Sequence, residues 1–171
     1  FIDAVYMSDA SNGLAVGDPV GGQWVLLTTA NGGVTWTPAT PLAQAGAEAG
    51  WNNSFEWTDA QHGWFGTNNS RVYRTVNGGA TWSFGATPGT NSYGVSFIST
   101  SLGMVGDAGG VTGKSIDGGA SWSAAASAGT GVTFPAGVAI PTQRWWMSSN
   151  TAIYKTTDQG TLWTLDHTRS G

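Results

Sequence analysis

The sequence predicts an all-β protein built from four similar antiparallel sheets, and a repeated motif and the composition together predict it. The motif is eight residues long: a hydroxyl residue, any residue, Asp or Asn, any residue, Gly, any residue, usually a second hydroxyl residue, and Trp. It occupies residues 29–36, 75–82, 115–122 and 156–163, so successive Trp residues lie 46, 40 and 41 positions apart. A period of about 40–50 residues is typical of β-propeller blades rather than of helical repeats. The 27 glycines and the low charged fraction of 9% fit many short strands joined by tight turns.

The repeated motif makes physical sense as a tight turn. The side-chain oxygen of Asp or Asn accepts hydrogen bonds from backbone N–H groups ahead of it, and the Gly two positions later supplies a positive φ. The Trp then covers the turn with a large apolar face. Because Asn31 and Asn77 keep the acceptor without the charge, we expect the turn to need an acceptor rather than a charge or a metal ion. Leu162 replaces the second hydroxyl residue, so we expect the fourth turn to be less fully tied.

These four segments resemble the Asp-box, or BNR, repeat of sialidases, xyloglucan-degrading hydrolases, sortilin-type receptors and photosystem II assembly factors. In that family the boxes are structural turns between the third and fourth strands of propeller blades, away from the active sites of the members that are enzymes. The resemblance covers nearly the whole chain, implies a β-propeller, and brings no catalytic residue with it. The residues that match the box are Thr29, Asn31, Gly33, Thr35, Trp36, Thr75, Asn77, Gly79, Thr81, Trp82, Ser115, Asp117, Gly119, Ser121, Trp122, Thr156, Asp158, Gly160 and Trp163.

Within each repeat, apolar and β-branched runs bounded by Gly clusters predict four strands. The predicted strands are 2–7, 14–17, 24–28, 34–37, then 54–57, 64–67, 71–75, 80–84, then 93–98, 103–107, 111–115, 120–124, and finally 132–140, 144–148, 152–156 and 162–166. The blades therefore span approximately residues 1–40, 51–86, 92–126 and 132–168, as one propeller domain or a partial propeller. No helix is predicted, although residues 38–48 could hold a helical turn.

Four blades lie at the bottom of the usual propeller range of about 4–8. The first repeat begins with its own first strand and the last ends with its own fourth strand, so no strand from one end completes a blade at the other. Either the chain is part of a larger propeller, or it closes as a small four-bladed ring. Because the family that it resembles mostly has more blades, we expect the first arrangement.

Charge and composition limit the classes of partner and location. The net charge is −4, with only six Lys and Arg residues, so the clustered cations of a nucleic-acid interface are missing. No apolar run approaches the roughly 20 residues of a membrane-spanning helix, and no signal-peptide pattern opens the chain. Since Phe1 is not an initiator residue, we expect a mature or excised segment. We expect an extracellular or cell-surface location, which includes the periplasm.

Candidate ligand-binding residues lie on the connections opposite the repeated turns, where loops vary without disturbing the sheets. The longest connection, residues 38–53, leads into the densest aromatic and amide cluster of the chain. Trp beside Asn and Glu suits stacking on a sugar and hydrogen bonding to it. The more ordinary interpretation is that Trp51 and Trp57 pack between adjacent blades. The candidate residues are Asp18, Trp51, Asn53, Glu56, Trp57 and Asp107.

Two carboxylates of this set occupy equivalent places, at the turn between the second and third strands. Asp18 follows a Val-Gly pair in the first repeat and Asp107 follows one in the third. As a glycosidase pair they would need a separation of about 5 Å or 6.5–9.5 Å, which is less than we expect between blades one and three. The favoured interpretation is that both cap Gly-rich hairpins.

No other catalytic, metal or cofactor site is predicted. The Arg cluster and Arg-Ile-Pro signature of sialidases are missing, and His62 and His167 lack the ligand spacing of a zinc site. There is no phosphate loop, GxSxG elbow or EF-hand spacing. Arg74, Lys114 and Lys155 share one repeat position, just before the first hydroxyl residue of the motif, which predicts a solvated outer strand face.

The expected function is a non-catalytic extracellular or cell-surface module that binds a protein partner or a glycan. The alternative is part of a carbohydrate-active propeller enzyme, with Trp51, Trp57, Asp18 and Asp107 along a glycan cleft. A third class, an assembly factor similar to the photosystem II group, would be favoured by a strongly basic patch, which the sequence lacks.

Overall fold

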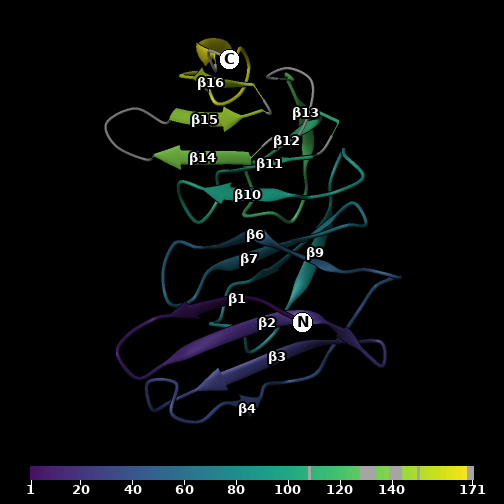
Figure 1. The fold of residues 1–171 in the computed structure, drawn as a ribbon, viewed down its shortest axis with the longest axis vertical. Helices are drawn as coiled ribbons and strands as arrows, with labels where there is room; N and C mark the ends of the chain where they lie inside the picture. Colours follow the sequence, from purple (N-terminus) through teal and green to yellow (C-terminus); the bar gives the residue numbers. More distant parts are fainter. Residues whose placement is uncertain (108, 128–133, 139–143, 150, 169–171) are drawn as a thin grey trace.

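The protein is all-β, with four antiparallel sheets that follow one another along the chain (Figure 1). The computed structural model describes residues 1–107, 109–127, 134–138, 144–149 and 151–168, without the side chains of residues 53 and 134–138. Among these residues there is no helix, and therefore none long and apolar enough to cross a membrane. Each sheet is a propeller blade, numbered 1 to 4 from the N-terminus.

The strands pair in chain order within each blade. Blade 1 holds β1 (Ile2–Met7), β2 (Gly13–Val20), β3 (Gln23–Thr29) and β4 (Thr37–Pro38), and blade 2 holds β6 (Gly50–Trp57), β7 (Gly63–Thr67), β8 (Arg71–Thr75) and β9 (Ser83–Ala86). Blade 3 holds β10 (Gly94–Phe97), β11 (Gly103–Gly106), β12 (Thr112–Ser115) and β13 (Ser123–Ala125), and blade 4 holds β14 (Phe134–Val138), β15 (Arg144–Ser148), β16 (Ala152–Thr156) and β17 (Thr164–Thr168). Residues 38–48, where a helical turn was considered, instead give a short fifth strand of blade 1, β5 (Leu42–Ala43), which pairs with β3.

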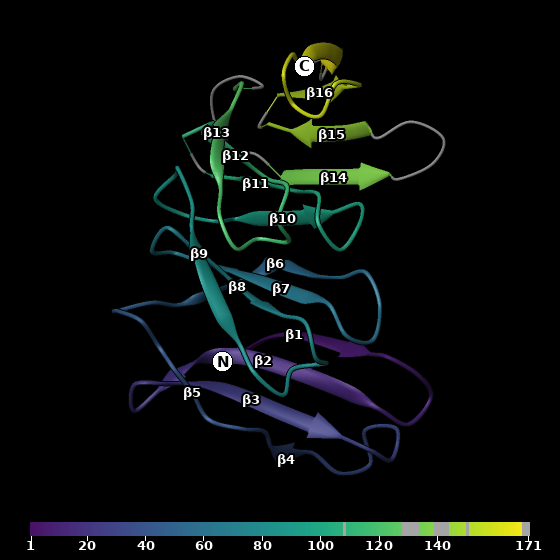
Figure 2. The same cartoon turned by 180° about the vertical axis from the view of Figure 1, so that it is seen from behind.

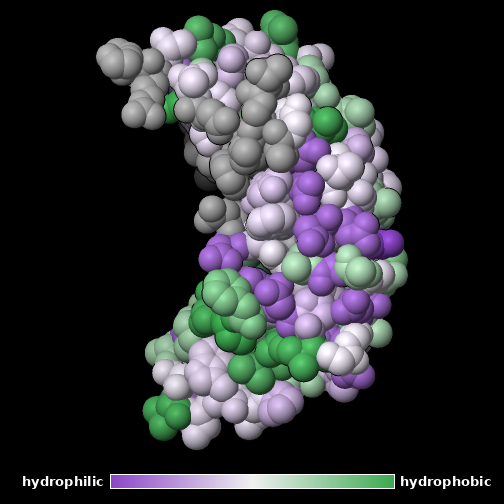
Figure 3. All heavy atoms as spheres, turned by 45° about the vertical axis from the view of Figure 1, so that its right-hand side comes forward, coloured by the Kyte–Doolittle hydropathy of each residue, from purple (hydrophilic) through white to green (hydrophobic). Residues whose placement is uncertain are grey.

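The four blades form an open arc rather than a closed four-bladed ring. The first strands lie next to one another, β1 with β6, β6 with β10 and β10 with β14, and so line the inner side of the arc. The last strands β4, β9 and β13 lie away from these first strands (Figure 2). Figure 3 shows the hollow side of the arc, with blade 1 at its lower end and blade 4 at its upper end.

The hydrophobic core lies between neighbouring blades rather than inside any one of them. The first cluster joins Leu14, Val16 and Trp24 of blade 1 to Phe65 and Tyr73 of blade 2, and two similar clusters join blades 2 and 3 and blades 3 and 4. Full burial of one such side chain contributes about 1.5–3 kcal/mol. Each sheet therefore depends on its neighbours for stability, as in other repeat proteins.

The four repeated turns share one hydrogen-bonding pattern, shown by the second. The hydroxyl oxygen of Thr75 accepts the N–H of Gly79 at 2.9 Å, and the hydroxyl donates to Asn77 Oδ1 at 3.0 Å. Asn77 Oδ1 also accepts the N–H of Thr81 at 2.9 Å. The glycines at the fifth position have φ between +82° and +87° in all four turns. In the fourth turn the N–H of Leu162 still donates to Asp158 Oδ1 at 3.0 Å.

The outer strands begin later than the sequence predicted. The predicted strands began at residues 34, 80, 120 and 162, whereas β4, β9, β13 and β17 begin at residues 37, 83, 123 and 164. The residue before each Trp donates its N–H to the Asn or Asp side chain of the turn, as Thr81 does to Asn77. A backbone group used in this way cannot join the ladder of the sheet, so the turn extends as far as the Trp.

The second, third and fourth repeated turns also pack on the preceding blade. A methyl group added at Gly79, Gly119 or Gly160 would meet Leu14, Trp64 or Met104 respectively, each the second residue of the second strand of the blade before. The turn of one blade therefore fits against the face of its neighbour at three successive junctions.

Candidate functional site

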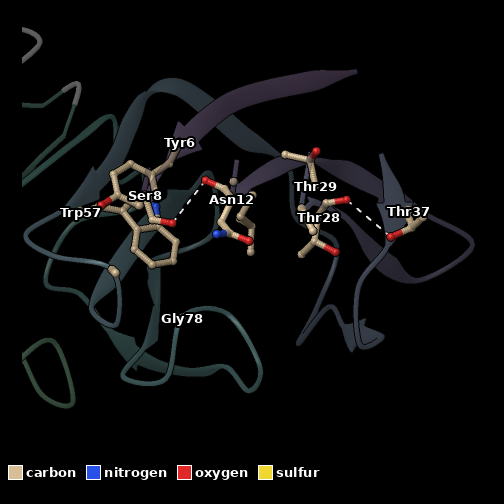
Figure 4. A pocket seen from close by; sticks show the side chains of 12 residues that line it. Tyr6, Ser8, Asn12, Thr28, Thr29, Thr37, Trp57 and Gly78 are labelled. Atoms are coloured by element: carbon tan, nitrogen blue, oxygen red, sulfur yellow. Dashed lines mark hydrogen bonds between the residues drawn. The ribbon is translucent and has the colours of Figure 1, made fainter. Parts of the chain in front are cut away.

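A pocket lies at the junction of blades 1 and 2, on the face that carries the repeated turns (Figure 4). Its volume is about 330 Å³, at the lower end of the range of small-ligand pockets. Strands β1 to β4 contribute most of its wall, and blade 2 contributes the end of β6, one loop residue and a turn glycine. The lining residues are Tyr6, Ser8, Asn12, Gly13, Leu14, Thr28, Thr29, Ala30, Thr37, Trp57, Ala60 and Gly78.

One wall of the pocket is aromatic. The rings of Tyr6 and Trp57 stack with centroids 4.6 Å apart and planes within 1° of parallel. Trp82 meets the Trp57 ring edge-on at 6.2 Å. The indole Nε1 of Trp57 is buried and has no hydrogen-bond partner among the described residues. Trp57 was predicted from the sequence as a candidate ligand-binding residue and lines this pocket, whereas its stacking partner Tyr6 was not predicted.

The rest of the lining is uncharged and combines hydroxyl and amide groups with Leu14, Ala30 and Ala60. Ser8 donates its hydroxyl to the carbonyl of Asn12 at 3.2 Å, and Thr37 donates to the carbonyl of Thr28 at 3.5 Å. Figure 4 shows the stacked rings on one side, the threonines on the other, and the loop that carries Gly78 passing below. Neutral hydroxyl and carbonyl groups beside aromatic rings can hold a ligand by hydrogen bonds and stacking.

Two carboxylates lie in the loops that flank this pocket. Asp9 follows the lining residue Ser8, and hydrogen bonds from Asn12 and from the backbone of Ser11 lower the pKa of its carboxyl group. Asp59 precedes the lining residue Ala60; slight burial raises its pKa, but hydrogen bonds from His62 and neighbouring backbone groups outweigh this and lower it. Both groups are therefore ionised at neutral pH.

In the pocket, a short side chain of blade 1 stands where other blades have a cation. Thr28 pairs with Leu14 across β3 and β2, and the matching pair in blade 2 is Arg74 with Trp64. Arg74 reaches the next turn and donates Nη1 to the Asp117 carbonyl at 3.2 Å. At the junction of blades 1 and 2, Leu14 packs beside Gly79 but carries no hydrogen-bond donor, and Thr28 is too short to reach the next turn. A further pocket, of about 410 Å³, lies at the junction of blades 3 and 4, where Lys114 is part of the lining.

This arrangement corrects one prediction. The shared position of Arg74, Lys114 and Lys155 was interpreted as a solvated outer face. Instead Arg74 bonds the turn of blade 3, and Lys114 donates Nζ to Gln159 Oε1 in the turn of blade 4 at 3.1 Å. In blade 4, Lys155 donates to Asp166 Oδ1 of its own sheet at 2.6 Å. The long stems of Arg74 and Lys114 therefore reach across to the next blade while their charged ends find acceptors, whereas Lys155 stays on its own sheet and its side chain is 44% exposed.

The two predicted tryptophans do not share a site. Trp51 lies at the start of β6 and Trp57 at its end, which places them roughly 20 Å apart along the strand. Trp51 packs on Tyr93 of the next blade, with ring centroids 4.2 Å apart and planes tilted by 36°. A single cleft lined by both tryptophans is therefore not present, and ligand binding by Trp51 remains a prediction.

The predicted carboxylates make structural hydrogen bonds. Asp107 is buried, and its Oδ1 accepts the N–H groups of Gly109 and Val111 at 2.8 and 2.9 Å. Asp18 Oδ1 accepts the N–H of Gly50 at 2.9 Å and so ties blade 1 to the start of β6. The two do not form a pair, since they lie in blades 3 and 1.

Of the remaining candidates, Glu56 points toward the next blade. Burial raises the pKa of Glu56 to about 7, against the lowering effect of its hydrogen bond with Ser96. The side chain of Asn53 lies outside the described residues.

Two acidic residues that were not predicted also lie near this junction, Glu48 buried and Asp3 half-buried. Glu48 has a fully buried side chain and accepts Arg71 Nη1 at 2.9 Å, which holds the long loop before β6 against blade 2. Burial, and then the charge of Asp18, raise the pKa of Asp3 to about 6. Within the described part of the chain, no group of three or more His, Cys, Asp or Glu side chains could hold a metal ion.

No protein-family model matches the sequence, and no curated protein matches it. The fold does match solved structures. YCF48 bound to a D1 peptide superimposes with a TM-score of 0.66 at 20% identity, and the match covers 96% of this chain and 54% of that one. A GH74 xyloglucanase from Xanthomonas campestris gives a TM-score of 0.63 at 18% identity, and the match covers 96% of this chain and 30% of the xyloglucanase. YCF48 from Cyanidioschyzon merolae gives a TM-score of 0.61 at 18% identity, and the match covers 99% of this chain and 56% of that one.

These likenesses concern the fold alone, because no identity exceeds 20%. The chain spans about half the length of the YCF48 structures and about a third of the xyloglucanase. The comparison and the four sheets together establish that the chain folds as blades of a β-propeller.

Proposed function

We propose that the chain is a non-catalytic binding and assembly module that takes a segment of a protein partner into the pocket between blades 1 and 2. The observation that carries the proposal is the pocket itself, with a stacked aromatic wall and an uncharged polar lining. A solved structure with the same fold holds a peptide, which supports a protein partner for this one. The lining holds no carboxylate, His, Lys or Arg side chain, which supports a binding role.

The proposal includes three features beyond the pocket. The repeated turns are Asp boxes, which their common hydrogen-bonding pattern supports. The arc belongs to a larger propeller with further blades, which its open shape supports. A location outside the cell or at the cell surface is also part of the proposal, and the low charged fraction of 9% with ten Trp residues supports it.

A second candidate function rests on the same aromatic wall. Tyr6 and Trp57 beside hydroxyl groups suit a sugar ring as well as a peptide, and one structural neighbour is a xyloglucanase. Under this alternative the chain is part of a carbohydrate-active propeller, and oligosaccharides occupy the pocket.

The test compares the two ligand classes on one purified chain. A random dodecapeptide library and a set of plant and bacterial oligosaccharides are screened against the wild type and against Thr28→Met, which fills the pocket with an uncharged side chain. Val34→Met is the matched control, because Val34 is 81% exposed on the first turn and does not line the pocket. The proposal expects peptides that bind the wild type and Val34→Met but not Thr28→Met. Binding of oligosaccharides alone, or their hydrolysis, would refute it.

A further inference from the structure

We infer that the pocket between blades 1 and 2 binds a basic side chain of the partner, arginine in preference to lysine, in the place that Arg74 fills one junction further along. This inference rests on the proposed function and names the chemical group that the pocket recognises. Three junctions join the four blades, and the other two are each bridged by a cation of the chain itself. The first junction has the same parts without the cation.

The acceptors at the second junction show what the first one is missing. Gly118 O accepts the indole N–H of Trp64 at 2.8 Å and Arg74 Nη1 at 3.5 Å, while Arg74 Nη1 also reaches Asp117 O at 3.2 Å. The matching carbonyl at the first junction belongs to Gly78, which lines the pocket. Its φ of +69°, against +72° for Gly118, places it in the same turn conformation.

The donors at the first junction have been replaced by groups that cannot donate to Gly78. Leu14 stands at the position of Trp64, and Thr28 stands at the position of Arg74. The Thr28 side chain is short and the Leu14 side chain has no polar hydrogen, so space and acceptors remain where a guanidinium would lie. A partner that supplies an arginine restores the bridge that the chain makes for itself elsewhere.

The walls of the pocket favour a planar cation. Tyr6 and Trp57 cover one face of each other, so a guanidinium would pack on the side of the stack that faces the pocket, and it presents several N–H donors in one plane. Asp9 and Asp59 lie in the loops that flank the pocket, and the chain as a whole carries −4. Because the lining residues themselves are uncharged, nothing in the pocket neutralises or repels an entering cation.

Amide-detected NMR titration with three small probes tests the inference directly. N-acetyl-arginine amide, N-acetyl-lysine amide and N-acetyl-citrulline amide are added to the chain, because citrulline keeps the shape and N–H groups of arginine without its charge. Arginine is expected to shift the Gly78 amide and to bind about tenfold more tightly than citrulline, since charge-assisted hydrogen bonds are about twice as strong as neutral ones. Gly118, whose junction is already filled, serves as the internal control and should not shift.

A self-filling variant supplies the second arm. Thr28→Arg places the missing guanidinium on the chain itself, so it should abolish arginine binding and raise the melting temperature. Val34→Arg adds the same charge on the exposed first turn and should leave binding unchanged. Equal affinity for arginine and citrulline, or undiminished arginine binding by a folded Thr28→Arg, overturns the inference. Should Thr28→Arg fail to fold, Thr28→Met tests the same point, because it also fills the pocket and should also abolish arginine binding.

The two proposals fail in different ways. Peptides that bind the pocket without any basic residue would remove the inference and leave the proposed function in place. A pocket that takes oligosaccharides and no peptide would remove the proposed function itself. Peptides selected by the wild type that are rich in arginine, and lose about tenfold in affinity when that arginine becomes citrulline, would support both.

Discussion

Replacing Gly119 by Ala should destabilise the protein more than the same change in the first turn. Gly119 has φ +84°, a conformation that costs an L-residue roughly 1–2 kcal/mol. The added methyl group would also lie 3.1 Å from Cδ1 and from Nε1 of Trp64. Trp64 cannot easily move away, because it is 1% exposed, stacks on Phe97 at 3.7 Å and donates to Gly118 O.

The expected loss follows from adding these two effects. Overpacking of a well-packed site costs typically about 1–3 kcal/mol, so Gly119→Ala should lower the free energy of unfolding by about 2–5 kcal/mol. Gly33 has the same φ of +84°, but an added methyl group would meet only the ring of its own Trp36, at 3.5 Å or more. Gly33→Ala should therefore lose only about 1–2 kcal/mol.

Urea unfolding of the two variants and the wild type measures the difference. The midpoint should fall further for Gly119→Ala, with an unchanged slope if the unfolded state is unaffected. Gly79→Ala should lie between them, because the methyl group meets the end of Leu14, which can turn into the adjoining pocket. Equal losses for Gly33→Ala and Gly119→Ala would refute the idea that the turns stabilise the protein by packing on the preceding blade.

Three further predictions concern hydrogen bonds and protonation. Ser115→Ala removes a buried hydroxyl that accepts the Gly119 N–H at 2.7 Å and should cost about 1–3 kcal/mol in chemical denaturation, whereas Thr35→Ala at an exposed hydroxyl should cost less than about 1 kcal/mol. Slight burial raises the pKa of Asp117, but hydrogen bonds lower it overall from 3.8 to about 2, so the stability that the ionised carboxylate contributes is lost as the pH falls through this window. In thermal melts at pH 2–5, Asp117→Asn should remove that loss of stability. An unchanged pH profile of the melting temperature would contradict the assignment. Burial raises the pKa of Glu56 from 4.5 to about 7, so the free energy of unfolding should fall as the pH rises through this range, because Glu56 ionises at lower pH in the unfolded chain. Glu56→Gln should reduce this fall. A pH dependence that is as steep in the variant as in the wild type would mean that another group causes it.

The sheets could be predicted because the turns that separate them are local. The hydroxyl, the Asn or Asp and the Gly of each turn bond to one another within eight residues, and their spacing is visible in the sequence. The first residues of the outer strands were harder to predict, since they depend on which backbone N–H groups are hydrogen-bonded in the turn. The open arc was not decided by local pattern at all, because it follows from packing between sheets.

The pocket was harder to predict than the fold. Trp57 was a candidate, but its partner Tyr6 comes from another blade, and nothing in the sequence near either one joins them. The signal that could have found the pocket is the repeat position that holds Arg74, Lys114 and Lys155, where blade 1 has Thr28. That position was interpreted as solvated, so its one uncharged member was not recognised as a gap.

Because the pocket lies between blades 1 and 2, a ligand bound there should make local unfolding of these blades less frequent. Within the described part of the chain, blade 1 packs on blade 2 through β1 and β6 and through the first core cluster. A ligand in that junction contacts both blades and stabilises their packing by mass action. Hydrogen exchange from the backbone of β1 and β2 should therefore slow when the pocket is filled, while exchange from β11 and β12 should keep its rate. Exchange at β1 and β2 would then report on the occupancy of the pocket.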